Sequence, residues 1–369
     1  MAVFTPFDYQ MMARAISLAK QGRFTTHPNP NVGCVITSGD TIVGEGFHFR
    51  AGEPHAEVHA LRMAGNKANG STAYVTLEPC SHYGRTPPCA KGLIDAGVSK
   101  VICAMQDPNP QVSGRGIQML RDAGIDVQVG LLEQDARNLN HAFLKKMESG
   151  RPWVQLKMAA SIDGQTALNN GQSKWITGVD ARKDVQQFRA QAGAILSTSK
   201  TVIDDTASLN VRWNDLSQSI QHTYLSTDVR QPTRIILDRQ ERLTPDMAVY
   251  QNEGTVLRVA ESNADICVPV NERNQLDIVQ LVEVLAKEHN INHIWVEAGA
   301  TLASSLIQSK IVDELIIYIA PQIMGSDGRG LFGALGIEQM DNVVKLEFSD
   351  VRQVGKDLRI IAKPIFRED

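Results

Sequence analysis

Strand-like and helix-like segments alternate along this chain, and that alternation limits its fold more than any other feature of the sequence. In the first 150 residues, short apolar runs such as KVICAMQ (100–106) alternate with segments of helical spacing such as HAEVHALRMAG (55–65). Strands that alternate with helices of about ten residues indicate a sheet covered by helices on both faces. We therefore expect an α/β protein with a mostly parallel sheet.

The segment MESGRPW (147–153) marks the boundary between two domains. Gly150 interrupts a helical pattern there, and Pro152 opens a new strand pattern. We expect domains at residues 1–149 and 150–369, and we expect the polar residues 213–232 to form a surface excursion. The chain ends in three strand-like runs in close succession, which predicts antiparallel pairing at one end of the second sheet: DELIIYIAPQI (313–323), VKLEFSDV (344–351) and LRIIAKPI (358–365).

Composition and charge exclude several classes of protein. Of the 369 residues, 43% are hydrophobic and 21% are charged, which is typical of a globular protein, and no apolar run reaches the roughly 20 residues of a membrane span. The first residues include Asp8 and have no uninterrupted apolar region, so they do not resemble a signal peptide. A net charge of −4 favours no nucleic-acid partner, and five cysteines without a secretory signal favour the cytoplasm.

Candidate metal ligands lie in two segments, EPHAEVHAL (53–61) and LEPCSHYGRTPPCAKG (77–92). His55 and His59 are four residues apart, so a helix places both on one face. Alternatively, His55 binds a metal together with Cys80 and Cys89, because a helix N-terminus stabilises the thiolate that zinc prefers. The second set leaves the fourth position of a tetrahedral zinc open for water, as catalysis requires. We expect this catalytic site and interpret His59 as a helix-face residue; a closed structural site with His59 as fourth ligand is the alternative.

Glu57 follows His55 by two residues, and this spacing is typical of zinc deaminases. In their signature the glutamate moves protons and does not bind the metal. Here the gap from Cys80 to Cys89 is wider than the two residues of that signature. We expect Glu57 to be the catalytic proton shuttle.

These motifs resemble a family of bifunctional deaminase/reductases of riboflavin biosynthesis, and the likeness covers almost the whole chain in order. NPNVG (29–33), HAEVHAL, TLEPCSHYGRTPPCAKG and DPNPQVSGRG (107–116) resemble its N-terminal half, and LKMAASIDG (156–164), SKWITG (173–178) and WVEAGATL (295–302) its C-terminal half. The resemblance implies a cytidine-deaminase-like three-layer α/β/α domain followed by a dihydrofolate-reductase-like α/β domain.

The resemblance also implies two activities. The first domain would hydrolyse the ring amino group of 2,5-diamino-6-ribosylamino-4(3H)-pyrimidinone 5′-phosphate, with one Zn²⁺ per domain. The second would reduce the ribosyl chain of the deaminated product to ribityl with NADPH. The expected partners are therefore this small pyrimidine ribose phosphate and, as in many enzymes of this size, further copies of the chain in a homodimer or higher homo-oligomer.

By the same resemblance, several residues fall on binding positions. Those for the deaminase substrate are Asn29, His48, His82, Arg85, Asp107 and Asn109. Those for the reductase substrate are Lys157, Ser173, Arg189, Leu209, Arg212 and Glu297. Those for the cofactor are Ala159, Trp175, Thr201, Asp205, Gly299, Ala300, Thr301, Leu302, Ala303, Ser304 and Ser305.

The residues themselves favour WVEAGATLASSL (295–306) as the phosphate-binding segment. A strand there leads through small residues into a helix, whose first N–H groups offer an anion site. A literal G-x-G-x-x-G at 328–333 is interpreted as a loop, because no βαβ pattern continues from it. Unlike many relatives, the chain has no glycines in STSK (197–200) and carries Thr206-Ala207 where an Asp/Asn-Pro pair is usual. Two other functions remain open, a nucleic-acid base deaminase with an accessory domain and a non-catalytic scaffold around a structural zinc.

Overall fold

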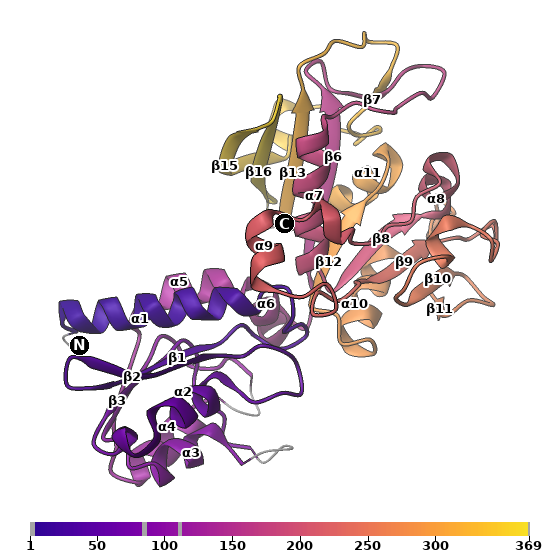
Figure 1. Cartoon of the computed structure of the whole chain (residues 1–369). Coiled ribbons are helices and arrows are strands. Elements are labelled where there is room, and N and C mark those ends of the chain that lie inside the picture. Colours follow the sequence, from indigo (N-terminus) through magenta and orange to yellow (C-terminus); the bar gives the residue numbers. More distant parts are fainter. Residues whose placement is uncertain (1–3, 83–86, 110–112, 368–369) are drawn as a thin grey trace. The chain divides into compact units, whose positions relative to one another are not determined.

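The computed structural model describes residues 4–82, 87–109 and 113–367 (Figure 1). Its contacts divide the chain into two compact units, Met1–Gly150 and Arg151–Asp369. The division falls at Gly150, which ends a helix with φ 71°, a left-handed conformation that glycine adopts without strain. In the described residues no helix has the length and apolar character needed to cross a membrane.

The first unit is built on a five-stranded sheet with the order β2-β1-β3-β4-β5. Its strands are β1 (Gly33–Ser38), β2 (Thr41–Phe47), β3 (Thr72–Val75), β4 (Lys100–Cys103) and β5 (Asp126–Val129). Strand β1 pairs antiparallel with both β2 and β3, whereas β3, β4 and β5 are parallel. The expectation of a mostly parallel sheet is therefore wrong for this unit, because a tight turn at Gly39 (φ 56°) reverses the chain between β1 and β2.

Helices cover both faces of this sheet, so the unit has the three layers that we expected (Figure 1). They are α1 (Pro6–Ala19), α2 (Ala56–Ala64), α3 (Cys89–Asp95), α4 (Arg115–Asp122), α5 (Glu133–Leu139) and α6 (His141–Ser149). One apolar cluster joins α2, α3 and α4 to the sheet, and a second joins α1, α5 and α6 to the other face. Helix α2 lies so close to β2 that a Cβ on Gly46 would come within 2.4 Å of Ala56 O.

The pattern at 133–150 predicts one helix, but the structure divides it into α5 and α6 at Asn140. The side chain of Asn140 is buried and contacts the backbone of Asn31: its Oδ1 accepts the Asn31 N–H at 2.7 Å, and its Nδ2 donates to the Asn31 carbonyl at 2.9 Å. This tertiary contact holds the loop that follows Asn29, which explains why the helix is interrupted there.

The second unit contains a nine-stranded sheet with the order β11-β10-β9-β8-β12-β6-β13-β16-β15. Its strands are β6 (Trp153–Ser161), β8 (Ala194–Thr198), β9 (Thr233–Leu237), β10 (Val256–Ala260), β11 (Ile266–Cys267), β12 (His293–Glu297), β13 (Glu314–Ala320), β15 (Lys345–Val354) and β16 (Asp357–Ile365). Pairing is parallel from β11 to β13 and antiparallel at β16 and β15, which confirms the antiparallel end predicted from the last three strand patterns.

Helices also cover both faces of this larger sheet. They are α7 (Val179–Gln191), α8 (Ser199–Asp205), α9 (Gln218–Thr223), α10 (Ile278–Lys287) and α11 (Ala300–Gln308). Helices α10 and α11 pack on one face, and α7 and α8 pack on the other, around Trp295 and Tyr318. The expected surface excursion at 213–232 is wrong in part, because α9 buries Ile220, and Leu216 and Tyr224 are also buried.

The segment Gly328–Gly333 contributes only the two-residue strand β14 (Arg329–Gly330), which pairs with β7 (Gln165–Ala167). No helix follows it before β15 in the described chain apart from a short 3₁₀ turn at Met340–Asn342. The interpretation of this glycine-rich motif as a loop is therefore confirmed.

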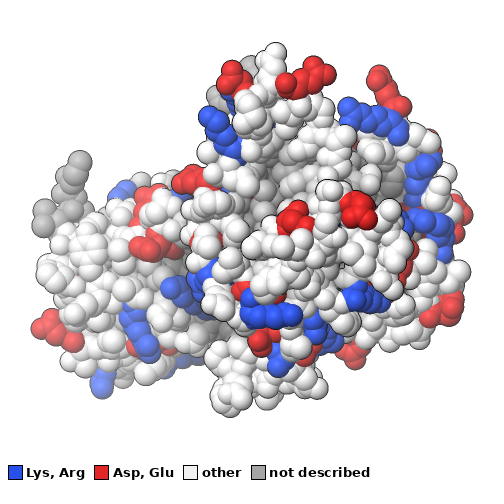
Figure 2. Space-filling view, turned by 90° about the horizontal axis from the view of Figure 1, so that it is seen from above, with Lys and Arg blue, Asp and Glu red and all other residues white. Residues whose placement is uncertain are grey.

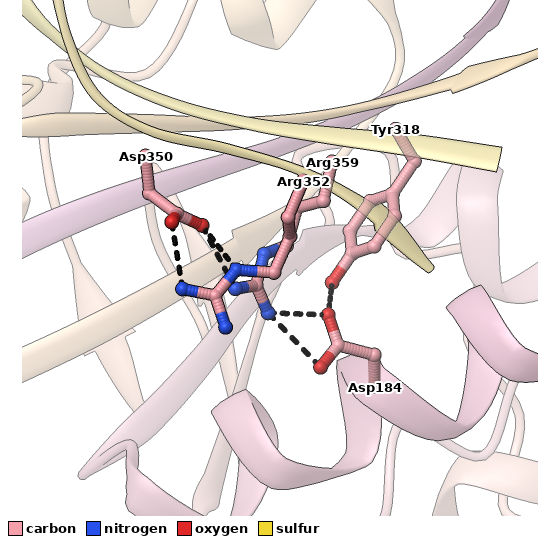
Figure 3. Close-up of polar contacts among 5 residues, drawn as sticks. All are labelled: Asp184, Tyr318, Asp350, Arg352 and Arg359. Atoms are coloured by element: carbon pink, nitrogen blue, oxygen red, sulfur yellow. Dashed lines mark hydrogen bonds and ion pairs between the residues drawn. The ribbon is translucent and has the colours of Figure 1, made fainter. Parts of the chain in front are cut away.

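A polar network connects α7 to the antiparallel end of the sheet (Figure 3). Arg359 on β16 donates to both oxygens of Asp184 on α7, at 3.0 and 2.7 Å, and the Tyr318 hydroxyl donates to the same carboxylate at 2.7 Å. Arg359 also donates to Asp350 on β15 at 3.1 Å, and Asp350 in turn pairs with Arg352. The network fixes α7, and hence the Arg189 that this helix carries, relative to the sheet.

Candidate active sites of the two units

The predicted metal ligands of the first unit come together. His55 lies at the N-cap of α2, Cys80 in the segment after β3, and Cys89 at the first residue of α3. The Nδ1 atom of His55 is 3.6 Å from Cys80 Sγ and 3.3 Å from Cys89 Sγ. Zn–S and Zn–N bonds of about 2.3 and 2.0 Å at a tetrahedral angle would separate such atoms by about 3.5 Å. The three ligand atoms therefore fit a Zn²⁺ ion.

The cluster has three ligands, and His59 does not join it. The backbone N–H of Cys89 donates to Cys80 Sγ at 3.3 Å, as expected for a sulfur near a helix start. Hydrogen bonding to the Cys89 thiol lowers the pKa of Cys80 to about 4, helped by His55 and opposed by burial. Cys80 is therefore a thiolate, the form that binds zinc.

Glu57 lies in the first turn of α2 and is only 3% exposed. Burial raises the pKa of Glu57 to about 7. Its Oε2 is buried and has no hydrogen-bond partner among the described residues. A buried carboxylate with a free oxygen beside an open metal position is suited to accept a proton near neutral pH and return it.

Two of the predicted substrate residues, Asn29 and His48, contact each other beside His55. His48 Nδ1 is 3.2 Å from Pro54 O, and His48 Nε2 is 3.1 Å from Asn29 Nδ2. Because a carbonyl only accepts and an amide nitrogen only donates, Nδ1 carries the proton and Nε2 accepts. Burial lowers the pKa of His48 to about 4, so the ring is neutral at pH 7 and holds the Asn29 amide in one orientation.

Two further predicted residues, Asp107 and Asn109, follow β4. Asp107 is buried, its Oδ1 accepts the Asn109 N–H at 2.8 Å, and burial raises its pKa. The exposed side chain of His82 is close enough for its charge to act on this carboxylate. Arg85 lies outside the described residues. Glu78 is a further buried carboxylate beside these residues, and it was not predicted; its only signal is a charge in the otherwise apolar run before Cys80.

A cleft of about 2030 Å³ opens in the second unit where β8, β9 and β12 end, at Thr198, Leu237 and Glu297. The carboxyl ends of parallel strands are the usual ligand site of such sheets. Nine of the predicted cofactor residues line the cleft: Ala159, Trp175, Thr201, Asp205, Gly299, Ala300, Thr301, Leu302 and Ser305. The predicted substrate residues also line it: Lys157, Ser173, Arg189, Leu209, Arg212 and Glu297.

The predicted cofactor segment needs one correction. Ala303 and Ser304 do not line the cleft, because that side of α11 faces the core, and the Ser304 hydroxyl accepts the Gly333 N–H at 2.8 Å. Gly299 caps the helix, and the Ala303 N–H donates to its carbonyl. A phosphate could bind the backbone N–H groups of Ala300, Thr301 and Leu302, which lie between these two residues.

Arg189 and Glu297 form an ion pair inside the cleft. Arg189 Nε and Nη2 donate to Glu297 Oε1 and Oε2 at 2.5 and 2.8 Å, and the Trp295 indole also donates to Oε1 at 2.8 Å. Burial alone would raise the pKa of Glu297, but Arg189, with help from Lys157 and Trp295, lowers it to about 2. The Arg189 Nη1 also donates to Asn210 O at 2.9 Å, so three N–H groups of this predicted substrate residue are engaged within the unit.

The two departures from the family pattern also line this cleft. In the STSK segment, the Thr198 hydroxyl caps α8 by accepting the Thr201 N–H at 3.2 Å. Thr206 ends that helix in the left-handed conformation, with φ 50°.

Trp175, another predicted cofactor residue, is 69% exposed, and the Arg182 guanidinium lies 4.5 Å from the centre of its ring. On the face shown in Figure 2, basic and acidic side chains are interspersed.

Comparison with known proteins agrees with both sites. Residues 6–105 match the family described as cytidine and deoxycytidylate deaminase zinc-binding region, and residues 152–360 match the RibD C-terminal domain. The riboflavin biosynthesis protein RibD of Escherichia coli K12 is 53% identical over 95% of this chain and 98% of its own, and that of Haemophilus influenzae is 49% identical over 99% of both.

Two solved structures resemble this chain over almost its whole length. Acinetobacter baumannii RibD (form 1) has a TM-score of 0.91 at 45% identity and covers 98% of this chain and 99% of its own. A Thermotoga maritima diaminohydroxyphosphoribosylaminopyrimidine deaminase/5-amino-6-(5-phosphoribosylamino)uracil reductase has a TM-score of 0.84 at 31% identity, covering 97% and 99%. Zn²⁺ and NADPH are the cofactors of the two activities. The chain belongs to the RibD family and is a bifunctional deaminase and reductase of riboflavin biosynthesis.

Proposed function

We propose that residues 1–149 form a deaminase domain. This domain removes the ring amino group of 2,5-diamino-6-ribosylamino-4(3H)-pyrimidinone 5′-phosphate. The second unit then reduces the ribosyl chain of the product to ribityl. One observation carries the proposal: three ligands for zinc surround an open position beside Glu57, whose free oxygen is buried. The Thermotoga maritima relative, which is named for both reactions on such a substrate, supports this choice.

The metal would be held by His55 Nδ1 and by the sulfurs of Cys80 and Cys89. Bound Zn²⁺ supplies Lewis-acid activation of water, which makes hydroxide available near neutral pH. Glu57 takes one proton of the attacking water on Oε2 and delivers it to the ring nitrogen. It then takes the proton of the hydroxyl group now on the ring carbon and delivers it to the amino group, which leaves as ammonia while the carbonyl forms. Its pKa of about 7 allows both transfers without a large energetic cost.

The remaining residues of the first unit orient the pyrimidine. Neutral His48 holds the Asn29 amide, so that the Asn29 Oδ1 can accept from a ring N–H or amino group. Asp107 and Asn109 present a second set of polar atoms from the end of β4, and His82 and Arg85 complete the predicted phosphate and ring contacts. These residues contribute mainly by positioning the substrate.

In the second unit, NADPH supplies the hydride, and the chain orients the two reactants. The N–H groups at the start of α11 would hold the cofactor pyrophosphate. Glu297 Oε1 already accepts two donors, whereas Oε2 accepts one from Arg189, so Oε2 has a lone pair for a sugar hydroxyl. Arg212 also lines the cleft, with a side chain 49% exposed; its Nε donates to Asp215 at 2.5 Å, and its Nη groups are candidates for the substrate phosphate.

The test uses the full chain and a matched pair of glutamate variants. Wild type should release ammonia from the small pyrimidine and then oxidise NADPH, with one Zn²⁺ per chain. Glu57→Gln should keep its zinc and lose deamination by about 10²- to 10⁴-fold. It should still reduce deaminated substrate that is supplied to it. Glu53→Gln, an exposed glutamate two residues before His55, should change neither activity. Ammonia release from oligonucleotides alone would contradict the proposal.

We also propose that the chain forms a homo-oligomer. Strands β15 and β16 expose apolar side chains on one face, which a second copy would cover: Leu346, Phe348, Val351 and Leu358. Sedimentation equilibrium should give a multiple of the 40.5 kDa chain mass, and a monomer at micromolar concentration would contradict the proposal.

A cytoplasmic location is proposed because all five cysteines lie in the described residues and none of them forms a disulfide.

A further inference from the structure

The carboxylate of Glu78 is an unusual buried charge close to the metal ligands. It lies two residues before Cys80 and is 4% exposed. No lysine or arginine of the described chain forms an ion pair with it. Instead it accepts four backbone N–H groups, all of them from the segment between β4 and the first turn of α4. A buried carboxylate is costly unless hydrogen bonds compensate it, so these four bonds hold Glu78 together with the backbone of Asp107 and the start of α4.

The two oxygens of Glu78 have different tasks. Oε2 accepts the N–H of Asp107 at 3.2 Å and the N–H of Gly114 at 2.9 Å, so one atom is bound to both ends of residues 107–114. Oε1 accepts the N–H groups of Gly116 and Ile117, at 2.8 and 3.2 Å, in the first turn of α4. That end of a helix carries partial positive charge, which favours a carboxylate there.

The packing around this contact leaves little freedom. A Cβ on Gly116 would come 1.9 Å from the Pro79 carbonyl and 3.2 Å from Glu78 Oε1. Gly114, the N-cap of α4, has φ 76°, which places its N–H toward the carboxylate without strain. The start of α4 is therefore pressed against the segment Glu78–Cys80, and Glu78 connects that segment to Asp107 and Asn109.

We infer that Glu78 is a positioning residue that sets the affinity of the deaminase site for its pyrimidine. It acts through Asp107 and Asn109, whose backbone it fixes relative to the Cys80 segment. Asp107 Oδ1 in turn accepts the Asn109 N–H at 2.8 Å, so displacement of the Asp107 backbone also displaces Asn109. The inference rests on the deaminase function proposed above and adds a residue that does not touch the substrate.

A carboxylate is needed at this position because both of its oxygens must accept. Glu78→Gln keeps the shape of the side chain but replaces one acceptor with an NH₂ group, which would face two N–H donors. The bonds at one oxygen are then lost, either those to Asp107 and Gly114 or those to α4. Glu78→Asp keeps the charge but shortens the reach, so it should retain part of the bonding and part of the affinity.

The experiment compares wild type, Glu78→Gln, Glu78→Asp and Glu133→Gln as full chains. Glu133 is also a glutamate in the first turn of a helix of this unit, but its side chain is 51% exposed, so it serves as the matched control. For each protein, KM and kcat for ammonia release, zinc content and reductase activity on deaminated substrate are measured. Hydrogen exchange of the peptides that span β4 to α4 is followed by mass spectrometry.

For Glu78→Gln we expect KM to rise roughly tenfold or more while kcat at saturation changes less than about threefold. Zinc content and reductase kinetics should equal those of wild type, and exchange should accelerate between β4 and α4. Glu78→Asp should show an intermediate KM, and Glu133→Gln should match wild type.

Three outcomes would overturn the inference. The first is an unchanged KM in Glu78→Gln. The second is a loss of zinc, which would give Glu78 a role in holding the Cys80 segment rather than the substrate segment. The third is a uniform loss of folded protein in both Glu78 variants, which would make the residue structural for the whole unit. Failure of wild type itself to release ammonia would instead refute the proposed substrate.

Discussion

Replacing Arg189 with methionine should destabilise the second unit strongly, because it leaves a carboxylate buried without its counter-ion. The side chains of Arg189 and Glu297 are only 10% and 13% exposed, so neither is well solvated. Methionine preserves most of the length and the apolar stem of arginine but provides no donor. Glu297 would keep the Trp295 indole and the more distant charge of Lys157.

The magnitude follows from the pKa of Glu297. In the folded protein Arg189, Lys157 and Trp295 overcome burial and lower that pKa from 4.5 to about 2. At about 1.4 kcal/mol for each pH unit, this difference corresponds to about 3.5 kcal/mol of stability at pH 7, of which Arg189 contributes the largest part. Removing one partner of a buried pair typically costs about 3–5 kcal/mol. We therefore expect Arg189→Met to lower the free energy of unfolding by about 3 kcal/mol.

Tryptophan fluorescence measures this effect in the full chain, because all four tryptophans belong to the second unit: Trp153, Trp175, Trp213 and Trp295. With a urea dependence of about 2 kcal/mol per molar, the midpoint should fall by about 1.5 M. Lys287→Met is the control. It breaks an ion pair with Glu283 in which the lysine is 67% exposed, and it should cost less than about 1 kcal/mol.

The pH dependence has a definite sign. In wild type the depressed pKa of Glu297 gives stability that is complete above pH 4.5 and is lost as the pH falls toward 2. In Arg189→Met burial should raise that pKa, so protonation relieves the cost and the deficit should be smaller at pH 5 than at pH 8. Adding Glu297→Gln to the variant should recover part of the loss. A deficit no larger than that of Lys287→Met, or one independent of pH, would refute the reasoning.

Three further predictions concern the remaining sites. Cys89→Ser should lower zinc content, measured by mass spectrometry, from one to well below one per chain and abolish deamination, while reduction of supplied deaminated substrate continues; retention of full zinc would contradict the ligand set. Gly46→Ala should push α2 away from β2, because the new Cβ would lie 2.4 Å from Ala56 O. The displacement of His55 and Glu57 should lower deaminase kcat/KM by about 10²-fold. Unchanged kinetics would contradict this prediction and show that α2 can relax. Asp184→Asn should destabilise the second unit by about 2–4 kcal/mol in the fluorescence assay, because Arg359 is 9% exposed and keeps only Asp350.

Local sequence patterns were sufficient to predict most elements of this chain, since helix and strand periodicity reflect which side chains are buried. The helix that ends at Gly65 and the antiparallel last strands follow from apolar spacing and turn residues. The break at Asn140 did not follow, because its cause is a contact with Asn31, more than one hundred residues away. The buried residues of α9 were missed because the segment is polar on average.

The chemistry of the first site was also predictable from sequence, because zinc ligands and their proton shuttle are short motifs with characteristic side chains. His55, Cys80 and Cys89 needed only to meet, and the structure brings them together. The role of Arg189 was not predictable, since an arginine in a helix can serve phosphate, solvent or a carboxylate equally well. Only the position of Glu297 at the end of β12 decides that it serves the carboxylate.

The sequence by itself determined the layered α/β architecture through its local spacing, and it determined the two activities through motifs shared with a known family. A domain boundary near Gly150 and the metal ligands were predicted from the same sequence. The tertiary structure alone decided which buried charges compensate one another. The ion pair of Arg189 with Glu297 joins segments that are distant in the chain, and so do the bonds from four backbone N–H groups to Glu78. The free-energy cost of burying a carboxylate is offset only where the fold brings a donor within hydrogen-bond distance.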